Sequence, residues 1–228
     1  MERLIVVKGK LEGQKISPRS QVITQEAWNT ITDNSPADMD VSGVPYLYAS
    51  KELLVEEPYC LEWCKHPFDM KAPLLVGKPG TGKTHLLWAM RREVLAQARK
   101  HKFTNWTGVK LNGVDVKILM ESSTQILHNI RQGISNNTSD SILDDKQEAH
   151  ILMIDDFGVE KISEWVCEQM FLIMDYRLVG GMPTAVSTNL SLGEIAANYG
   201  ERIVSRLFEM CHKIEITGDD RRLFVKVK

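Results

Sequence analysis

The sequence contains few cysteines and no long run of apolar residues. Four cysteines in 228 residues are typical of a reducing compartment, where thiols serve as small apolar side chains. The apolar stretch at residues 4–7 is too short for the core of a signal peptide, and no run approaches the length of a membrane span. We therefore expect a soluble, cytoplasmic protein that makes no contact with a membrane.

An excess of charge of one sign is also lacking. The chain has 28 lysines and arginines against 30 aspartates and glutamates, a net charge of -2. This balance excludes an overall positive field that attracts nucleic acid, so any contact with DNA must be local. A length of 228 residues with 43% hydrophobic residues suffices for one α/β domain with a short extension.

Cys60, Cys64 and His66 form the one candidate metal cluster in the sequence. A structural zinc site requires four ligands, usually as two ligand pairs. In a second interpretation, Cys60 and Cys64 lie one turn apart on a helix with Leu61 and Trp63. The ligand count favours the helix over the metal site.

Apolar residues recur with two alternating periods along residues 53–188. Steps of three and four residues predict helices, whereas short apolar runs predict strands. The helices are expected at 53–63, 86–98, 126–130 and 165–179, and the strands at 74–76, 116–120, 151–154 and 185–187. Residues 133–140 are expected to form a mobile loop. Helices that alternate with buried strands are typical of an α/β fold with a parallel sheet covered on both faces.

A glycine-rich segment follows the predicted strand 74–76 and opens the next helix. Residues 77–84 read Gly-Lys-Pro-Gly-Thr-Gly-Lys-Thr, which is the P-loop pattern in its specific structural context. Its glycines let the backbone approach phosphates, which backbone N–H groups and the helix N-terminus then bind. We expect Lys83 to reach the β- and γ-phosphates of ATP and the Thr84 hydroxyl to ligate Mg²⁺.

The predicted nucleotide-binding set extends through the whole segment. It comprises Gly77, Pro79, Gly80, Thr81, Gly82, Lys83, Thr84 and His85. Within the loop, the side chains of Lys78 and Thr81 are expected to face solvent.

Two aspartates follow the predicted strand 151–154. A carboxylate at the end of a neighbouring strand is the second half of a phosphate-binding site. Asp155 fits the magnesium side, directly or through water, and Asp156 is placed to orient or deprotonate the water that attacks the γ-phosphate. The alternative for Asp156 is a turn or helix-capping role before Phe157 and Gly158.

Further motifs occur in a fixed order along the chain. They read Gly-Lys-Pro-Gly-Thr-Gly-Lys-Thr-His at 77–85, Ile-Asp-Asp-Phe-Gly-Val-Glu-Lys at 154–161, Pro-Thr-Ala-Val-Ser-Thr-Asn-Leu-Ser at 183–191, Glu-Arg-Ile-Val-Ser-Arg-Leu at 201–207 and Gly-Asp-Asp-Arg-Arg at 218–222. Together they resemble the AAA+ ATPases of the bacterial DnaC and DnaI helicase loaders and the IstB transposition helpers, and residues 43–46 resemble the segment before that ATPase core. The resemblance implies a P-loop AAA+ core with a parallel five-stranded sheet flanked by helices and no full C-terminal lid domain. It places the ATPase domain at residues 43–228 and an N-terminal extension, a candidate partner-binding segment, at 1–42.

The resemblance also assigns nucleotide contacts outside the P-loop. Asn189 is similar to the family's sensor at the tip of the fourth strand, where an amide holds the attacking water or the γ-phosphate. A cap of the following helix is the alternative for this asparagine. Arg222 matches the arginine of the closing motif, a role that neighbouring Arg221 could also fill.

Arg206 lies in a Ser-Arg-Leu triplet that resembles the arginine-finger segment of AAA+ proteins. Such an arginine stabilises transition-state charge in the site of a neighbouring subunit. Helical spacing leaves Arg206 on the exposed face, together with Arg202 and Glu209. A surface ion pair with Glu209 or Glu201 is the alternative role. The residues expected on the buried face are Ile203, Val204, Leu207, Phe208 and Cys211.

Basic residues are concentrated around residues 91–102. As contacts for single-stranded DNA we consider Arg91, Arg92, Arg99, Lys100, His101 and Lys102, with Phe103 and Trp106 as stacking residues. Lys110 and Lys117 are second candidates, because the resembling family binds DNA from that side. The alternative is a solvated helix face.

The function that the resemblance implies is ATP-dependent loading of a replicative helicase in DNA replication. ATP with Mg²⁺ would bring subunits together into a ring or spiral, which binds the helicase and single-stranded DNA and hydrolyses ATP across subunit interfaces. One alternative is an IstB-like ATPase that recruits or regulates a transposase. From other classes, a small-molecule P-loop kinase would use Lys83 identically, and an ATP-binding adaptor would show little turnover. Asn189 and the Ser-Arg-Leu segment argue against the kinase.

Overall fold

The computed structural model describes residues 55–105, 107–111 and 115–220. In chain order, the helices and strands are α2 (Pro58–Lys65), β1 (Ala72–Val76), α3 (Lys83–Lys100), β2 (Phe103–Thr104), β3 (Lys110–Leu111), β4 (Ile118–Ser122), α4 (Ser123–Ser135), α5 (Ser139–Glu148), β5 (Ile151–Phe157), α6 (Glu164–Val179), β6 (Thr184–Thr188), α7 (Leu192–Tyr199), α8 (Glu201–Met210) and β7 (Cys211–Glu215). The predicted alternation of helices and buried strands is confirmed.

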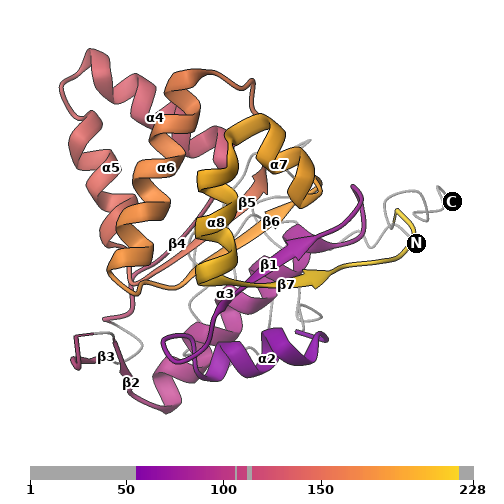
Figure 1. Ribbon diagram of the computed structural model, residues 1–228. Coiled ribbons are helices and arrows are strands. Elements are labelled where there is room, and N and C mark those ends of the chain that lie inside the picture. The colour runs from indigo at the N-terminus through magenta and orange to yellow at the C-terminus, as the bar shows by residue number, and fades with distance from the viewer. Residues whose placement is uncertain (1–54, 106, 112–114, 221–228) are drawn as a thin grey trace, which may run out of the picture.

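A parallel sheet of five strands lies at the centre of the molecule, in the order β4-β5-β6-β1-β7 (Figure 1). Because its strands are parallel, their carboxyl ends meet at one edge, where ligands of open α/β sheets bind. The predicted fold class, a parallel five-stranded sheet flanked by helices, is therefore confirmed. The short strands β2 and β3 form a separate antiparallel pair.

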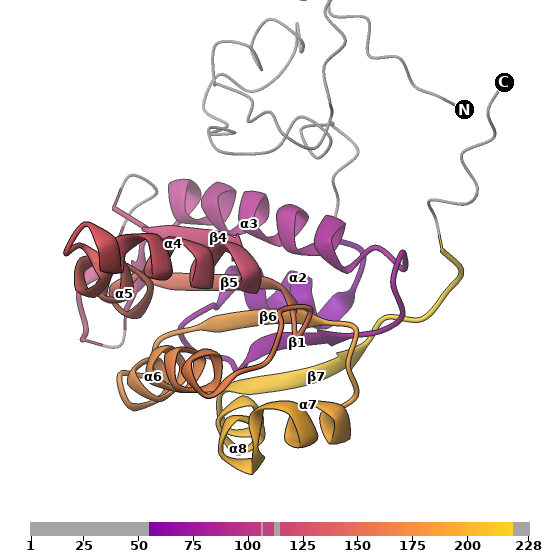
Figure 2. The same cartoon turned by 90° about the horizontal axis from the view of Figure 1, so that it is seen from above.

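The sheet separates two hydrophobic cores. Successive side chains of β5 alternate between them: Ile151 and Met153 pack with α2 and α3, whereas Leu152 and Ile154 pack with α4, α6, α7 and α8. Figure 2 shows α3 on one side of the sheet and α6, α7 and α8 on the other. A strand buried on both faces reads as a continuous apolar run, which explains why the sequence revealed it clearly.

The expectation of a mobile loop at 133–140 is wrong. Helix α4 continues through Gly133 to Ser135, a short turn follows, and α5 begins at Ser139. Gly133 allows the two helices to approach closely, since a Cβ atom there would lie 2.8 Å from Ser139 N and from Ile142 Cδ1. Helix α5 was missed because it is mostly polar and contributes only two partly buried apolar residues, Ile142 and Leu143, to the core.

Helix α2 resolves the two interpretations of the cysteine pair. Cys60, Trp63 and Cys64 are fully buried in the core between α2 and α3, as the helical interpretation predicted. Among the described residues, no group of three histidine, cysteine or acidic side chains could hold a metal ion. The described helices also include none that is long and apolar enough to cross a membrane.

Arg177 links α6 to the sheet through hydrogen bonds inside the core. Its side chain is fully buried, and its guanidinium donates hydrogen bonds to Thr184 Oγ1 at 2.7 Å and to the carbonyl of Pro183 at 2.7 Å. Further bonds of 2.8–3.0 Å run to the carbonyls of residues 146, 147 and 149. Burial lowers the pKa of Arg177 to about 9, so the group remains charged at neutral pH. This one side chain joins the end of α5, α6 and the start of β6.

Candidate nucleotide-binding site

The glycine-rich segment connects the carboxyl end of β1 to the first turn of α3. Gly80 and Gly82 have φ values of 82° and 102°, in the left-handed region that favours glycine. Gly77 is needed for close approach, since a Cβ atom there would lie 2.2 Å from the carbonyl oxygen of Ile216. The loop therefore has the backbone freedom that the sequence predicted for a phosphate cradle, and it opens onto the N-terminus of α3.

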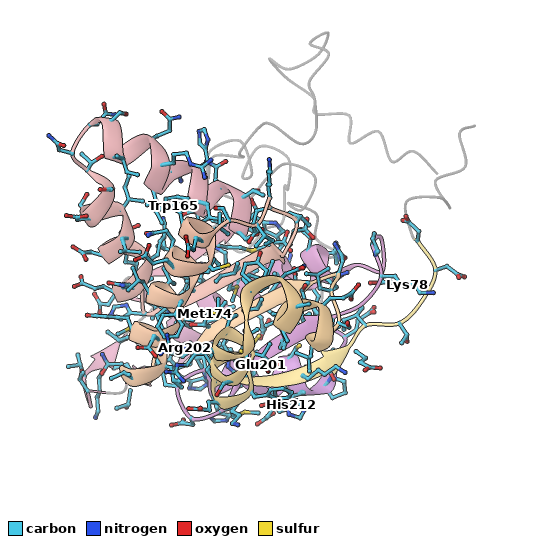
Figure 3. The ribbon with its side chains drawn as sticks, turned by 45° about the horizontal axis from the view of Figure 1, so that its top comes forward. Lys78, Trp165, Met174, Glu201, Arg202 and His212 are labelled. Carbon is cyan, nitrogen blue, oxygen red and sulfur yellow. The ribbon has the colours of Figure 1, made fainter. Side chains whose placement is uncertain are left out.

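The side chains of the loop lie only partly as expected. Lys78 is exposed and projects from the loop (Figure 3), as predicted, and Pro79 is exposed beside it. Thr81 was expected to face solvent, but it is 2% exposed, and its hydroxyl donates a 2.9 Å hydrogen bond to the carbonyl of Lys78. The buried hydroxyl closes the loop on itself, so Thr81 shapes the cradle. His85 is half-buried in the first turn of α3.

Lys83 is buried at the centre of the site, with 4% exposure. Its ammonium lies 2.7 Å from the carbonyl of Gly77, 2.8 Å from that of Lys78 and 2.7 Å from Asn189 Oδ1. These three acceptors match the three protons that a lysine can donate. The contacts place Lys83 inside the cradle, where the sequence analysis expected it.

The two predicted magnesium ligands lie side by side. Thr84 Oγ1 is 3.1 Å from Asp155 Oδ1, and neighbouring oxygens around an octahedral Mg²⁺ are about 2.9 Å apart, given ligand distances of 2.0–2.1 Å. The Ser187 hydroxyl donates a 2.5 Å hydrogen bond to the same Asp155 oxygen. Burial raises the pKa of Asp155 and the charge of Asp156 adds to this, against the hydrogen bonds from Ser187 and Thr84. A hard, oxygen-rich pair of this kind fits Mg²⁺.

Asp156 has a left-handed backbone with φ of 50°, and it lies where the pairing of β5 with β6 shifts register between Ile154 and Phe157. Its backbone N–H donates to Ser187 Oγ at 3.0 Å, and its carbonyl accepts a 3.0 Å hydrogen bond from Ser123 Oγ. The carbonyl also accepts a longer bond of 3.4 Å from the backbone N–H of Val159, which closes a turn. The backbone of Asp156 thus serves the turn, while its half-buried side chain stands next to Asp155.

Asn189 lies directly after β6, and its side-chain oxygen contacts Lys83. The alternative of a helix cap is wrong, because Ser191 caps α7 and forms a capping box with Glu194. The Asn189 side chain therefore binds Lys83 and does not cap α7. The bond between Asn189 and Lys83 brings the predicted sensor and the P-loop together.

The last segment of the described chain also reaches the cradle. After β7, the backbone N–H of Ile216 donates a 2.7 Å hydrogen bond to the carbonyl of Val76, so the chain passes beside the loop. Farther on, Asp220 packs against Gly80, where an added Cβ atom would lie 1.9 Å from Asp220 Oδ1. The resemblance of 218–222 to a closing motif pointed to this segment, but to Arg222 or Arg221 and not to Asp220. Arg221 and Arg222 lie outside the described residues.

Arg206 is less exposed than predicted. Its Nε donates a 2.6 Å hydrogen bond to Asp175 Oδ1 on α6, and the side chain is 29% exposed. The guanidinium carbon lies 5.5 Å from the ring centre of Phe171. The expected alternative partners, Glu209 and Glu201, are not the ones used. Sequence could not reveal this pair, because Asp175 is far from Arg206 along the chain.

The buried face of α8 also differs from its prediction at one end. Ile203, Val204 and Leu207 are buried as expected, whereas Phe208 is 53% exposed. Cys211 is buried but belongs to β7. The helix ends at Met210, so the helical spacing could not be extended to Cys211.

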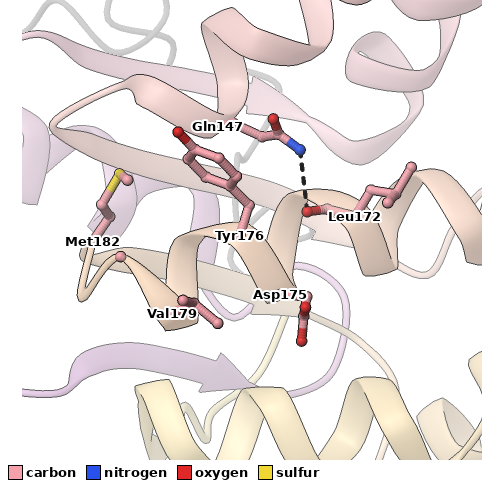
Figure 4. Close-up of a pocket in the computed structure, with 7 residues that line it drawn as sticks. Gln147, Leu172, Asp175, Tyr176, Val179 and Met182 are labelled. Atoms are coloured by element: carbon pink, nitrogen blue, oxygen red, sulfur yellow. Dashed lines mark hydrogen bonds between the residues drawn. The ribbon is translucent and has the colours of Figure 1, made fainter.

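A pocket of about 530 Å³ lies beside Asp175, away from the phosphate site (Figure 4). It is lined by Gln147, Leu172, Asp175, Tyr176, Val179, Gly180 and Met182. The C-terminal end of α6 leads into the start of β6, whereas the phosphate loop lies at the carboxyl ends of the strands. The cavity therefore takes no part in the site described here.

The basic candidates for DNA contact lie mainly at the far end of α3, about 27 Å from its N-terminus at a rise of 1.5 Å per residue for 18 residues. Exposed cations there are Arg99, Lys100 and Lys102, and His101 is exposed among them. The stacking role expected for Phe103 is wrong, because that ring is 6% exposed and packs edge-on against Phe68. Lys117 forms a 2.5 Å ion pair with Asp145, and Trp106 lies outside the described residues.

The comparisons with known proteins agree with this geometry. Residues 54–228 match a family described as IstB-like ATP binding protein, and this match covers well over half of the chain. The chain belongs to the IstB-like family. Its membership supports ATP as the nucleotide of the site.

Curated relatives of this IstB-like chain include replicative helicase loaders. It is 28% identical to the replicative helicase loader DnaC of Escherichia coli (strain K12) over 131 residues, which are 58% of this chain and 47% of DnaC. Identity to the replicative helicase loader DnaI of Bacillus subtilis (strain 168) is 22% over 165 residues, covering 67% of this chain and 48% of DnaI. The chain spans about half the length of the curated relatives it matches.

Solved structures confirm the AAA+ fold of the IstB-like chain. The crystal structure of the DnaC helicase loader matches with a TM-score of 0.56 and 23% identity, over 70% of this chain and 87% of that one. The AMPPCP-bound DnaA from Aquifex aeolicus matches with a TM-score of 0.56 and 18% identity, over 73% and 46% of the two chains. At these identities the likeness concerns the fold alone.

Proposed function

We propose that this protein is an AAA+ ATPase that loads a replicative helicase onto single-stranded DNA. The observation that carries the ATPase proposal is the contact of Lys83 with Asn189, beside the paired oxygens of Thr84 and Asp155. This arrangement brings a cation, a polar sensor and a metal-ligand pair to the carboxyl edge of one sheet. Similarity to the helicase loaders DnaC and DnaI supports the choice of partner.

Hydrolysis is assigned to residues that lie at the carboxyl edge of the sheet, among which Lys83 contacts Asn189 and Thr84 contacts Asp155. Thr84 and Asp155 would hold Mg²⁺, which supplies charge neutralisation on the β- and γ-phosphates. Lys83 binds those phosphates, and Asp156 orients or deprotonates the attacking water. Asn189 holds that water or the γ-phosphate.

ATP binding must rearrange the site, because Lys83 already has three acceptors. Phosphate oxygens replace all three acceptors of Lys83, the two carbonyls and the Asn189 amide oxygen, since charge-assisted hydrogen bonds to phosphate are stronger than bonds to neutral groups. Asn189 then loses its lysine partner and turns to the γ-phosphate. The amide thereby distinguishes the nucleotide-free site from the ATP-bound one.

Arg206 completes the site of a neighbouring subunit in the assembled ring or spiral. For this role it must leave Asp175, with which it is paired in the isolated chain. An ion pair that remains about one-third exposed contributes little to stability, so the exchange is energetically accessible. Assembly, ATP binding and hydrolysis are coupled through this arginine.

DNA contact is assigned to the exposed cations at the end of α3, Arg99, Lys100 and Lys102. They would bind phosphates without stacking, since the Phe103 ring is buried. Residues 1–42 are proposed as the partner-binding segment, and 43–228 as the ATPase domain. A transposase in place of the helicase is the second candidate, because the family description names IstB.

Affinity capture with the Asp156→Asn variant tests the proposal. The variant should bind ATP and accumulate in the assembled state because hydrolysis is slowed. ATP-dependent capture of a replicative helicase from the native host supports the loader, whereas capture of a transposase supports the second candidate. Equal capture with and without ATP would contradict an ATP-switched assembly.

A further inference from the structure

The Ser123 hydroxyl, at the first residue of α4, lies between two acceptors, one on Asp156 and one on Glu160. It is 3.0 Å from the carbonyl oxygen of Asp156 and 2.5 Å from Glu160 Oε2. Ser123 is fully buried, so these protein groups, and not bulk water, compete for its proton. Ser123 thus bridges the backbone of the proposed water-positioning residue and a carboxylate four residues farther along.

A serine hydroxyl carries one proton, whereas a carbonyl and an ionised carboxylate only accept. Ser123 can therefore give a full hydrogen bond to Asp156 or to Glu160, but not to both. With the proton toward Asp156, the carbonyl of this left-handed residue is held firmly. With the proton toward Glu160, the Asp156 carbonyl loses the Ser123 bond and, among the hydrogen bonds of the described residues, keeps the 3.4 Å bond from Val159 N.

The second oxygen of Glu160 links the same loop to α7. Glu160 Oε1 accepts a hydrogen bond from the Tyr199 hydroxyl, and the Tyr199 ring stacks on Phe157 with 4.6 Å between ring centres. Burial and the hydrogen bond to Glu160 raise the pKa of Tyr199, so its hydroxyl remains a donor. Tyr199 is thus bound to two residues of the segment that follows Asp156.

Tyr199 connects Glu160 to helix α8. It is the last residue of α7, and Gly200, with φ of 87°, joins it to α8. Helix α8 carries Arg206, the residue proposed to act in a neighbouring site. Helix α8 is therefore connected through Gly200 to Tyr199, and from there through Glu160 to Ser123.

We propose that Glu160 is a positioning residue, which sets the backbone of Asp156 through Ser123 and links it to the α7–α8 unit through Tyr199. The inference rests on the proposed ATPase function. When Tyr199 draws Glu160 away, Ser123 donates its proton to the Asp156 carbonyl. The backbone of Asp156 is then fixed, and its carboxylate is held in position to activate the attacking water. When Glu160 again accepts the Ser123 proton, the hydrogen bond to the Asp156 carbonyl is weakened, and the rate of ATP hydrolysis falls.

Steady-state ATPase kinetics of Glu160→Gln and Ser123→Ala, singly and together, test the proposal. Ser123→Ala removes the donor to the Asp156 carbonyl, and we expect kcat to fall on the order of 10-fold, as for other residues that position a reactive group. Glu160→Gln weakens the competing acceptor, so the Ser123 proton turns to Asp156 and kcat should rise. The dissociation constant of a fluorescent ATP analogue should stay within about 2-fold, because Lys83 and the loop are untouched. The double variant should have the kcat of Ser123→Ala, since Glu160 acts on Asp156 only through Ser123. Glu168→Gln, at an exposed position of α6, is the matched control and should behave as wild type.

The chemical shift of the Asp156 backbone amide provides a readout that does not depend on activity. It should move in Glu160→Gln and Ser123→Ala, and to a smaller extent in the milder variant Tyr199→Phe, but not in Glu168→Gln. An unchanged or lower kcat in Glu160→Gln, or a double variant whose kcat differs from that of Ser123→Ala, would overturn the inference. If wild type shows no hydrolysis, the proposed function fails, and the amide shift then decides whether Glu160 still sets the Asp156 backbone.

Discussion

Lys83 and Asn189 are joined by a 2.7 Å hydrogen bond between the ammonium and the side-chain oxygen of the amide. The two residues belong to different strand-to-helix connections, after β1 and after β6, and the parallel sheet brings the ends of these neighbouring strands together. The same lysine also binds two carbonyls of its own loop. All three of these acceptors are internal to the protein, so ATP must compete with them for Lys83.

Asn189→Ala should separate ATP binding from hydrolysis. The change frees Lys83 from one internal acceptor, so nucleotide affinity should be kept or rise slightly. Loss of the amide that contacts the water or the γ-phosphate should lower kcat on the order of 100-fold, as for other preorganised polar groups. Fluorescent-nucleotide titration and phosphate release measure the two effects. Asn198→Ala, at an exposed position of α7, is the control, and equal kcat values for the two variants would contradict the sensor role.

Asp220→Asn should tighten nucleotide binding. The Asp220 carboxylate packs against Gly80, where the negative phosphates of ATP are expected, and charges about 4 Å apart in water interact by about 1 kcal/mol. Removing the charge should therefore lower Kd roughly 5-fold. Because salt screens this repulsion, the advantage of the variant should shrink at high ionic strength. Asp219→Asn, at the exposed neighbouring position, is the control, and weaker ATP binding in Asp220→Asn would show that the carboxylate helps hold the loop.

Arg206→Ala should retain ATP binding and lose hydrolysis, by roughly 10³-fold in kcat if it acts as a finger in trans. Lys83→Ala should also be inactive, but because it no longer binds the phosphates of ATP. Mixing the two inactive proteins should restore part of the activity, because interfaces form that combine an intact loop with an intact Arg206. Absence of any rescue at concentrations where wild type is active would argue against the shared site.

The sequence predicted the fold and the phosphate loop well because both depend on local patterns. Apolar runs identify β1, β5 and β6, and the glycine spacing identifies the cradle, as the backbone of Gly80 confirms. Contacts between distant segments could not be derived in this way. The pairing of Arg206 with Asp175 and the approach of Asp220 to Gly80 depend on how α8, α6 and the segment after β7 pack.

Small polar residues account for most of what the site prediction missed. Ser187 and Ser123 bind the two aspartates, yet serine is common in sequences, and its spacing along the chain carries no signature. Ser187 lies within a buried strand and was predicted only as part of it. Their roles emerge once β5 shifts register against β6 and leaves the backbone of Asp156 in need of partners.

Arg177→Met should destabilise the fold without direct effect on the phosphate site. The buried guanidinium satisfies carbonyls of residues 146, 147, 149 and 183, which methionine would leave without these bonds. We expect the free energy of unfolding to fall by about 3 kcal/mol or more, measured by chemical denaturation. Arg99→Met, at an exposed position of α3, should change it by less than about 0.5 kcal/mol. A similar small change in Arg177→Met would mean that water or other groups replace the lost bonds.

His150 should make the stability of the protein fall in mild acid. Its Nδ1 accepts a 3.0 Å hydrogen bond from the backbone N–H of Lys117, which requires that nitrogen to be unprotonated. Burial lowers the pKa of His150 below 6.5, the charges of Lys117 and Arg177 lower it further, and Asp115 opposes the shift.

An unfolded histidine has a pKa of about 6.5, so during acidification the unfolded chain takes up the His150 proton before the folded one does. The stabilising contribution is therefore fully present above about pH 6.5, and it is lost as pH falls from there through the lower folded pKa. Urea denaturation between pH 8 and 5 measures this decline. In His150→Gln, whose amide oxygen can still accept from Lys117 N, the decline should be shallower than in wild type. His128→Gln, at an exposed position of α4, is the control, and identical pH profiles for His150→Gln and wild type would show that the histidine does not titrate with unfolding.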